Sequence, residues 1–120
     1  MIEIRPETHG NVLAIRGTRR LTAEDYEELL IPSLESLIKD HSKARLLFEM
    51  GPDFRGWNID AAWRATKFSL KHKDEFEKVA ALCGPKWVHW AMKLSSYLID
   101  GDVRVFPCDQ RYQALEWINN

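Results

Sequence analysis

The sequence has few cysteines, no excess of charge of either sign and no long apolar run, and each shortage excludes a class of protein. Two cysteines in 120 residues are too few for the disulfide framework of a small secreted domain. Seventeen Lys and Arg residues against 18 Asp and Glu residues leave a net charge of -1, which provides no basic footprint for nucleic acid. No apolar stretch approaches the roughly 20 residues that cross a bilayer, and the amino terminus lacks a secretion-signal pattern. We therefore expect a soluble cytoplasmic protein without a transmembrane segment or a nucleic-acid partner.

Motifs for catalysis, metals and cofactors are also missing. The four histidines show no H-x-x-x-H spacing, and the cysteines are not arranged as CxxC. Neither GxSxG nor a glycine-rich phosphate loop occurs. His89 would need a nucleophile and an orienting acid to act in catalysis, and no motif supplies them. We expect no catalytic residue, no metal and no cofactor, so an enzyme is the least favoured interpretation.

The elements that the sequence does predict alternate between strands and helices. Residues 2–5 and 12–16 read as strands joined by turn residues, which favours an antiparallel hairpin. Thr22 and Asp25 form a capping box at the start of a helix, and Pro32 should kink it. The further expected elements are a strand at 44–50, a helix at 59–72, a strand at 76–83, a helix at 86–98, a strand at 103–106 and a last helix capped by Asp109.

This order, β-β-α-β-α-β-α-β-α, predicts one α/β domain over residues 1–120 with a five-stranded mixed sheet. The connection from the second strand to the third contains a helix, so those strands should be parallel with a right-handed crossover. The first strand, joined by the hairpin, is the expected antiparallel exception.

Several segments together resemble a known family. The matching stretches are Leu21–Tyr26, Pro32–Glu35, Arg45–Met50, 61–80, Gly84 with Trp87, Val105–Phe106 and Ala114–Ile118. In this order and spacing they resemble the SpoIIAA-like family, a branch of the STAS group of anti-sigma-factor-antagonist-like domains. That family is similar in fold to the CRAL-TRIO lipid-transfer domains. The resemblance implies a mixed sheet with helices and no established catalytic chemistry.

The sequence departs from that family in one loop. The resemblance implies a phosphorylatable serine after the third strand, at the start of the next helix. Residues 52–60 hold no Ser or Thr, although Asp53 or Asp60 offers a fixed negative charge. The resemblance therefore does not carry a kinase-controlled switch over to this chain.

The loops after the parallel strands form the first candidate site. Ligands bind beyond the carboxyl ends of strands in open parallel sheets, and here residues 51–58, 83–87 and 107–109 follow strands. A protein partner or an amphipathic ligand would suit this aromatic and charged rim, whose residues are Asp53, Phe54, Arg55, Trp57, Lys86, Trp87 and Trp90. The alternative is a well-packed loop with a few surface charges.

The two cysteines also follow strands at that edge. Cys108 precedes a helix, where a thiolate is favoured, so a redox pair or a nucleophile is one interpretation. The favoured interpretation is a pair of ordinary reduced thiols, as expected in the cytosol.

A pocket is the second candidate site. The tryptophans, with Met92 and other large apolar residues, exceed what one side of two helices needs. Trp63 and Met92 are the residues that we expect in a pocket between helices and sheet, against the alternative of plain core packing. Three functions follow: a module that binds a protein partner through residues 51–58, a carrier or sensor of a small apolar or lipid-like ligand, and an enzyme of unspecified reaction. A homodimer is also consistent with exposed apolar helix faces.

Overall fold

The computed structural model describes residues 1–120 and is built on a five-stranded sheet. Its strands are β1 (Ile2–Ile4), β2 (Val12–Gly17), β4 (Ala44–Met50), β6 (Phe76–Leu82) and β7 (Asp102–Phe106), in the order β1-β2-β4-β6-β7. β1 pairs antiparallel with β2, and the other neighbours are parallel. The predicted mixed sheet and the antiparallel hairpin are confirmed.

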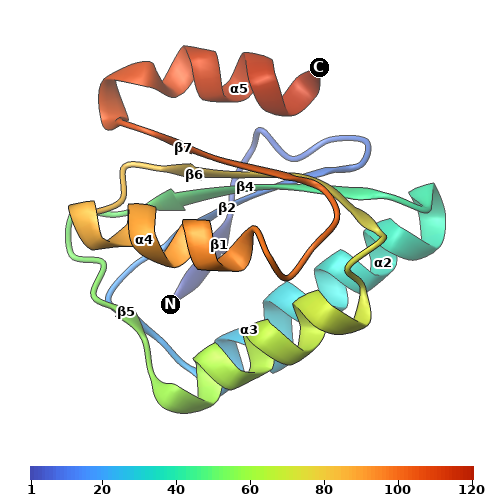
Figure 1. Ribbon diagram of the computed structural model, residues 1–120, viewed down its shortest axis with the longest axis horizontal. Helices are drawn as coiled ribbons and strands as arrows, with labels where there is room; N and C mark the ends of the chain where they lie inside the picture. The colour runs from blue at the N-terminus through green and yellow to red at the C-terminus, as the bar shows by residue number, and fades with distance from the viewer.

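Helices cover both faces of this sheet, but unequally. α2 (Ile31–His41), α3 (Ile59–Lys71) and α4 (Lys86–Ser95) lie on one side, and α5 (Arg111–Asn119) lies alone on the other (Figure 1). Successive residues of β2 point to opposite faces, so Leu13 and Ile15 join the larger core while Val12 and Ala14 join the smaller one under α5. The two-sided cover explains why β2 and β4 are apolar along most of their length.

The first helical segment contains the irregularity that Pro32 predicts. Thr22 and Asp25 make the expected capping box before the short α1 (Ala23–Asp25). A π-helical turn, η1 (Tyr26–Leu30), follows, and the Ile31 N–H donates to the Tyr26 carbonyl five residues earlier. Proline has no N–H, and its ring crowds the preceding turn of an α-helix. The wider π turn accommodates it, and α2 then continues regularly.

A second, two-stranded sheet was not predicted. β3 (Arg20–Leu21) pairs parallel with β5 (Gly56–Trp57), so the chain after β2 is fastened to the loop after β4. Bonds at either end extend the pairing: the Arg55 N–H donates to the Arg19 carbonyl at 2.7 Å, and the Asn58 N–H donates to the Leu21 carbonyl at 2.9 Å. These two strands hold the loop of residues 51–58 in one conformation.

Several helix faces and ends differ from the predictions. On α3, the large apolar residues Ile59, Trp63 and Leu70 are exposed, and the buried residues are Ala61 and Phe68. α4 ends at Ser95, before the expected residue 98. Asp109 is not a cap, because it lies inside a 3₁₀ turn, η2 (Cys108–Gln110), that precedes α5.

The helices are also short and amphipathic. None of them combines the length and the hydropathy that a bilayer crossing requires.

Candidate functional site

The structure gathers the aromatic residues of the predicted rim at the carboxyl ends of the strands. Glu49 of β4, Leu82 of β6 and Phe106 of β7 lie in register, so the loops that follow these strands begin side by side. The ring centroids of Phe54 and Trp57 are 5.3 Å apart, and both rings lie within 6.2 Å of the Trp87 ring. Residues 51–58 and the start of α4 therefore share one aromatic cluster.

Burial divides this rim into two groups. Phe54 is buried and Trp57 is half-buried, so these side chains belong to the packing of the loop. Asp53, Arg55 and Lys86 are exposed, as are the rings of Trp87 and Trp90. The sequence did not single out Arg19 and Arg20, which share a shallow polar hollow with Asp53 and Arg55.

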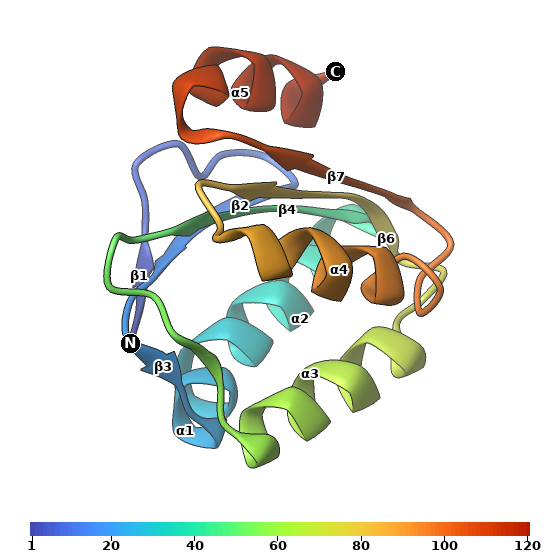
Figure 2. The same cartoon turned by 60° about the vertical axis from the view of Figure 1, so that its left-hand side comes forward.

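An apolar cavity lies between the sheet and the three helices on its larger side. Its volume is about 370 Å³, and 18 of its 21 lining residues are hydrophobic. The sheet contributes Leu46, Phe48 and Val79, and the helices contribute residues that include Phe68 and Met92. Figure 2 shows α2, α3 and α4 together on this side of the sheet. No charged side chain lines the cavity.

One hydroxyl group and one indole N–H provide the polar contact in this lining. The Trp57 Nε1–H donates to the Tyr26 hydroxyl at 2.8 Å. Burial raises the pKa of Tyr26 far above its usual value, so the hydroxyl stays protonated. The Tyr26 hydroxyl oxygen is the acceptor in that bond, and its own hydrogen donates to no protein group. Tyr26 can therefore donate a hydrogen bond to a molecule in the cavity.

Of the three other hydroxyls in the lining, two are engaged by their own helices, and the Ser69 hydroxyl makes no hydrogen bond within the protein. The Thr66 hydroxyl donates to the Ala62 carbonyl at 2.9 Å, and the Ser95 hydroxyl donates to the Ala91 carbonyl at 3.1 Å. Side chains that bond back in this way offer little polarity to their surroundings. The cavity is therefore an apolar space with two available hydroxyl donors, those of Tyr26 and Ser69.

The two residues that we expected in a pocket have different positions. Met92 lines the cavity. Trp63 does not: its side chain is 61% exposed, and the Lys67 ammonium lies 6.0 Å from the ring centroid. The expectation for Trp63 is therefore wrong, because α3 turns its small residues toward the sheet. Ala62 and Ala65 line the cavity instead, and this run of small residues was the available sequence signal.

The cysteines are not free thiols. Cys83 and Cys108 form a disulfide, with their Cα atoms 4.3 Å apart. The favoured interpretation of two reduced thiols is therefore wrong. The pairing follows from the topology, because β6 and β7 are parallel neighbours and the two cysteines follow the paired residues Leu82 and Phe106.

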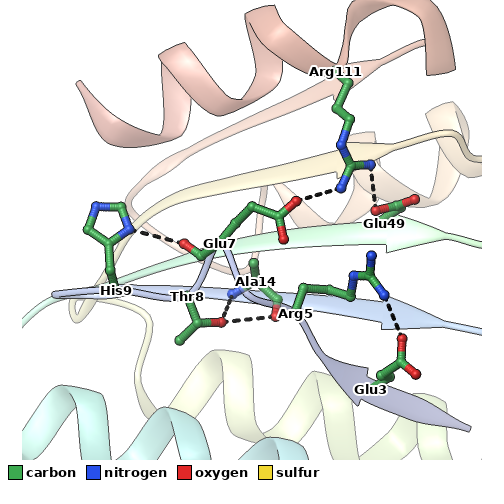
Figure 3. Close-up of polar contacts among 8 residues, drawn as sticks. All are labelled: Glu3, Arg5, Glu7, Thr8, His9, Ala14, Glu49 and Arg111. Atoms are coloured by element: carbon green, nitrogen blue, oxygen red, sulfur yellow. Dashed lines mark hydrogen bonds and ion pairs between the residues drawn. The ribbon is translucent and has the colours of Figure 1, made fainter.

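A polar network occupies the face of the sheet under α5. Arg111 donates through Nη2 to Glu7 at 2.6 Å and through Nη1 to Glu49 at 2.7 Å (Figure 3). Burial acts to raise the pKa of Glu7, but the hydrogen bond and the charge of Arg111 outweigh it and lower that pKa below its usual value. The network joins the turn after β1 to β4 and α5, and it has no connection to the cavity.

Comparisons with known proteins place this fold. The model of the SpoIIAA-like family matches residues 12–119. An uncharacterised protein of the DUF3478 family from Shewanella loihica PV-4, whose crystal structure has a SpoIIAA-like fold, is 29% identical to this chain. The superposition covers 98% of this chain and 93% of that one, with a TM-score of 0.77. No curated protein matches the sequence.

Proposed function

Because the chain belongs to the SpoIIAA-like family, as the match over residues 12–119 shows, we propose that it is a non-catalytic module that holds a small apolar ligand. The observation that carries this proposal is the apolar cavity of about 370 Å³. Its volume lies within the range of about 300–1,000 Å³ that is typical of small-molecule pockets. The module is a carrier or a sensor of such a ligand.

The energetics of the cavity favour occupation. Side chains around an unfilled apolar space lose contacts on one side, and that loss grows with the volume of the space. A ligand that fills the space restores those contacts and removes its own apolar surface from water. Binding would therefore stabilise the folded chain by mass action.

The lining also indicates the chemistry of the ligand. An ion would lose its hydration without gaining a charged partner, because no charged side chain lines the cavity. The Tyr26 hydroxyl can satisfy one acceptor, such as a carbonyl, ether or hydroxyl oxygen. The Ser69 hydroxyl can serve a second acceptor, so the expected ligand is an apolar molecule with one or two hydrogen-bond acceptors.

A route into the cavity runs beside α4. Leu94 lines the cavity and is also 50% exposed, so this residue stands at the opening. Trp90, one turn before Leu94 in α4, and Tyr97, just after the helix ends, are exposed as well. An apolar ligand would meet apolar side chains before it entered.

A cavity-filling variant tests the proposal. Ala65→Phe adds an aromatic ring to the inward side of α3 and should reduce the affinity for the neutral dye N-phenyl-1-naphthylamine at least tenfold. Trp63→Ala, two residues away but outside the cavity, is the matched control and should leave dye binding unchanged. Fluorescence titration measures both. Equal affinity in the Ala65→Phe variant and the unmodified chain contradicts the proposal. Native mass spectrometry is a second test, and the proposal also fails if neither the purified chain nor the chain mixed with dye carries a bound molecule.

A protein partner on the rim is the second candidate. Trp87 and Trp90 are 47% and 71% exposed, and Arg55 and Lys86 are exposed at the same end of the sheet. Exposed Trp beside Arg is the usual composition of interaction hot spots. A second copy of the chain is one such partner, so the expected homodimer stays a prediction.

Sedimentation velocity separates this candidate from a monomeric carrier. If the rim joins two copies, the unmodified chain should sediment as a dimer and the Arg55→Ala, Trp90→Ala double variant as a monomer, with Trp63→Ala as the control. A stable heterologous partner should likewise be lost from the double variant alone. If the double variant keeps every partner of the unmodified chain, the rim is not the contact surface.

A further inference from the structure

We propose that the Cys83–Cys108 disulfide is a redox modification site, which a dithiol reductant opens and whose opening loosens α4 over the cavity. The consequence for the cavity rests on the proposed ligand-binding function, whereas the site itself does not. The bridge joins the two loops that lead from β6 into α4 and from β7 into α5. The oxidation state of the bridge therefore affects the starts of two helices, α4 and α5, that lie on opposite faces of the sheet.

The bridge is accessible to a reductant. Cys108 is exposed, and Cys83 is partly exposed. Thiol–disulfide exchange requires an attacking thiolate to reach one sulfur, and access decides which sulfur that is. The Sγ of Cys108 is the favoured point of attack because its residue is the more exposed of the two.

The exchange with a dithiol balances as follows. A thiolate of the reductant attacks Cys108 Sγ, forms a mixed disulfide and expels Cys83 as a thiolate. The second thiolate of the reductant then attacks the first sulfur of the reductant, which is bonded to Cys108 Sγ in the mixed disulfide. This step forms the oxidised reductant and expels Cys108 as a thiolate. The two cysteine thiolates each take up a proton. Two electrons pass from the dithiol to the bridge, and a disulfide of the same class reverses the reaction.

The two helices that the bridge connects are anchored very differently. α5 buries Ala114 and Ile118 completely. The carbonyl groups of Trp117 and Ile118 also accept hydrogen bonds from Lys78 at 3.0 Å and from Arg45 at 2.9 Å. With Arg111 held by two carboxylates, α5 has anchors along its whole length.

α4 has much less to hold it. Val88 is its one fully buried residue, and Trp87 packs with one side against Phe54 and Trp57. The other large apolar side chains of α4 face the cavity or solvent. Segments with few buried apolar contacts open first. When the bridge breaks, α4 should therefore gain mobility while α5 remains in place.

The backbone at Cys83 adds to this asymmetry. Cys83 has a φ of 69°, in the left-handed region, which costs a non-glycine residue energy and persists only where surrounding contacts enforce it. The bridge, the Cys83 N–H bond to the Phe106 carbonyl at 3.1 Å and packing against the smaller core hold it there, and reduction removes the first of these. Lys86, the first residue of α4, follows only three positions later. Relaxation at Cys83 would therefore reorient the start of the helix.

A loosened α4 would change access to the cavity. Ala91, Met92 and Leu94 of this helix line the cavity, and Leu94 stands at its opening. Reduction should therefore speed the exchange of a bound apolar molecule. The bridge would then couple the redox state of the surroundings to release of the ligand.

Hydrogen exchange with mass spectrometry tests the site without any ligand. In the folded chain treated with a thioredoxin-class dithiol, residues 84–98 should exchange at least tenfold faster than in the oxidised chain, and residues 111–119 should be unchanged. The Cys83→Ser, Cys108→Ser double variant should match the reduced chain and show no further response to the dithiol. Identical exchange in the oxidised and reduced chains overturns the proposal. Alkylation of free thiols gives a second test. If the dithiol reduces the bridge only after denaturant has unfolded the chain, the proposal is also overturned.

The dissociation rate of N-phenyl-1-naphthylamine tests the coupling to the cavity. A rate at least threefold higher in the reduced chain supports it, and equal rates with a loosened α4 overturn it. If the dye binds neither form while the hydrogen-exchange difference is present, the proposed ligand function fails and the redox site stands. The two failures are therefore distinguishable.

Discussion

Tyr26 and Trp57 show how one hydrogen bond can serve both packing and binding. The Trp57 Nε1–H donates to the Tyr26 hydroxyl at the wall of the cavity. A tryptophan N–H that is removed from water needs an acceptor, and tyrosine supplies one while keeping its own hydrogen free. The pair therefore satisfies the indole and leaves one donor for a ligand.

Removal of the Tyr26 hydroxyl should lower the unfolding free energy by a measurable amount. Tyr26→Phe leaves the Trp57 N–H without its partner, and an unsatisfied buried donor costs about 1–3 kcal/mol of unfolding free energy. Urea denaturation followed by tryptophan fluorescence measures the loss. Tyr112→Phe is the control because that side chain is 75% exposed, and it should be neutral. Equal midpoints for the two variants would show that the bond contributes nothing.

The ion pairs of Arg111 make stability depend on pH at the level of single carboxyl groups. Glu7 has a pKa below its ordinary value of about 4.5 when the chain is folded, so its contribution is fully present above that value. The contribution is lost as the pH falls through the lowered pKa. The Arg111→Met variant lacks this contribution to the unfolding free energy, because Glu7 and Glu49 lose the cation between them.

The stability difference between the unmodified chain and Arg111→Met should therefore be largest near pH 7 and shrink below pH 4.5. Thermal unfolding at a series of pH values measures it. Arg64→Met removes an exposed ion pair with Glu27 and should have little effect at any pH. A difference that grows on acidification would contradict the assigned role of Arg111.

At the scale of elements, β3 and β5 give the loop of residues 51–58 its shape. The loop reaches back to pair with the chain after β2, and Gly56 is the residue that permits the approach. Its φ is +98°, and a Cβ added there would lie 2.9 Å from Trp87 Cη2. The aromatic cluster of the rim therefore depends on a position without a side chain.

Gly56→Ala should lower the unfolding free energy by about 1–3 kcal/mol, because the alanine must adopt a strained φ and displace the Trp87 ring. Gly10→Ala separates the two causes, since Gly10 also has a positive φ but no atom within 4 Å of the added Cβ. Urea denaturation of both variants gives the comparison. An equal loss in the two variants would mean that the contact with Trp87 is unimportant.

The elements also show which sequence patterns were informative. Alternation of strands and helices predicted the sheet, since each buried strand was bounded by turn residues. The inward side of α3 was not predictable, because its helix carries two apolar stripes. The larger residues, Ile59, Trp63 and Leu70, form the exposed stripe, while Ala61, Ala65 and Phe68 face the sheet. Periodicity gives the spacing of a stripe but not which of two stripes is buried.

At the scale of the whole molecule, the cavity and the disulfide depend on contacts between distant segments. The cavity is lined by residues from Tyr26 to Val103, so the surplus of large apolar residues indicates a pocket and Met92, but no local pattern reveals the rest of the lining. The cysteines are 25 positions apart, and only the neighbouring placement of β6 and β7 brings them together. The sequence did predict that residues 51–58, 83–87 and 107–109 follow strands on one edge, since parallel strands impose this. The size of the cavity and the contacts of these loops depend on how side chains from distant segments pack together, which the sequence pattern does not give.

The single helix on one face of the sheet has a consequence for synthesis of the chain. Val12, Ala14, Leu47 and Ala80 form an apolar floor that α5 alone covers. On the ribosome, these residues emerge well before Arg111–Asn119. Until α5 is synthesised, the nascent chain therefore exposes this apolar face of the sheet to solvent. We expect chaperone binding during that interval.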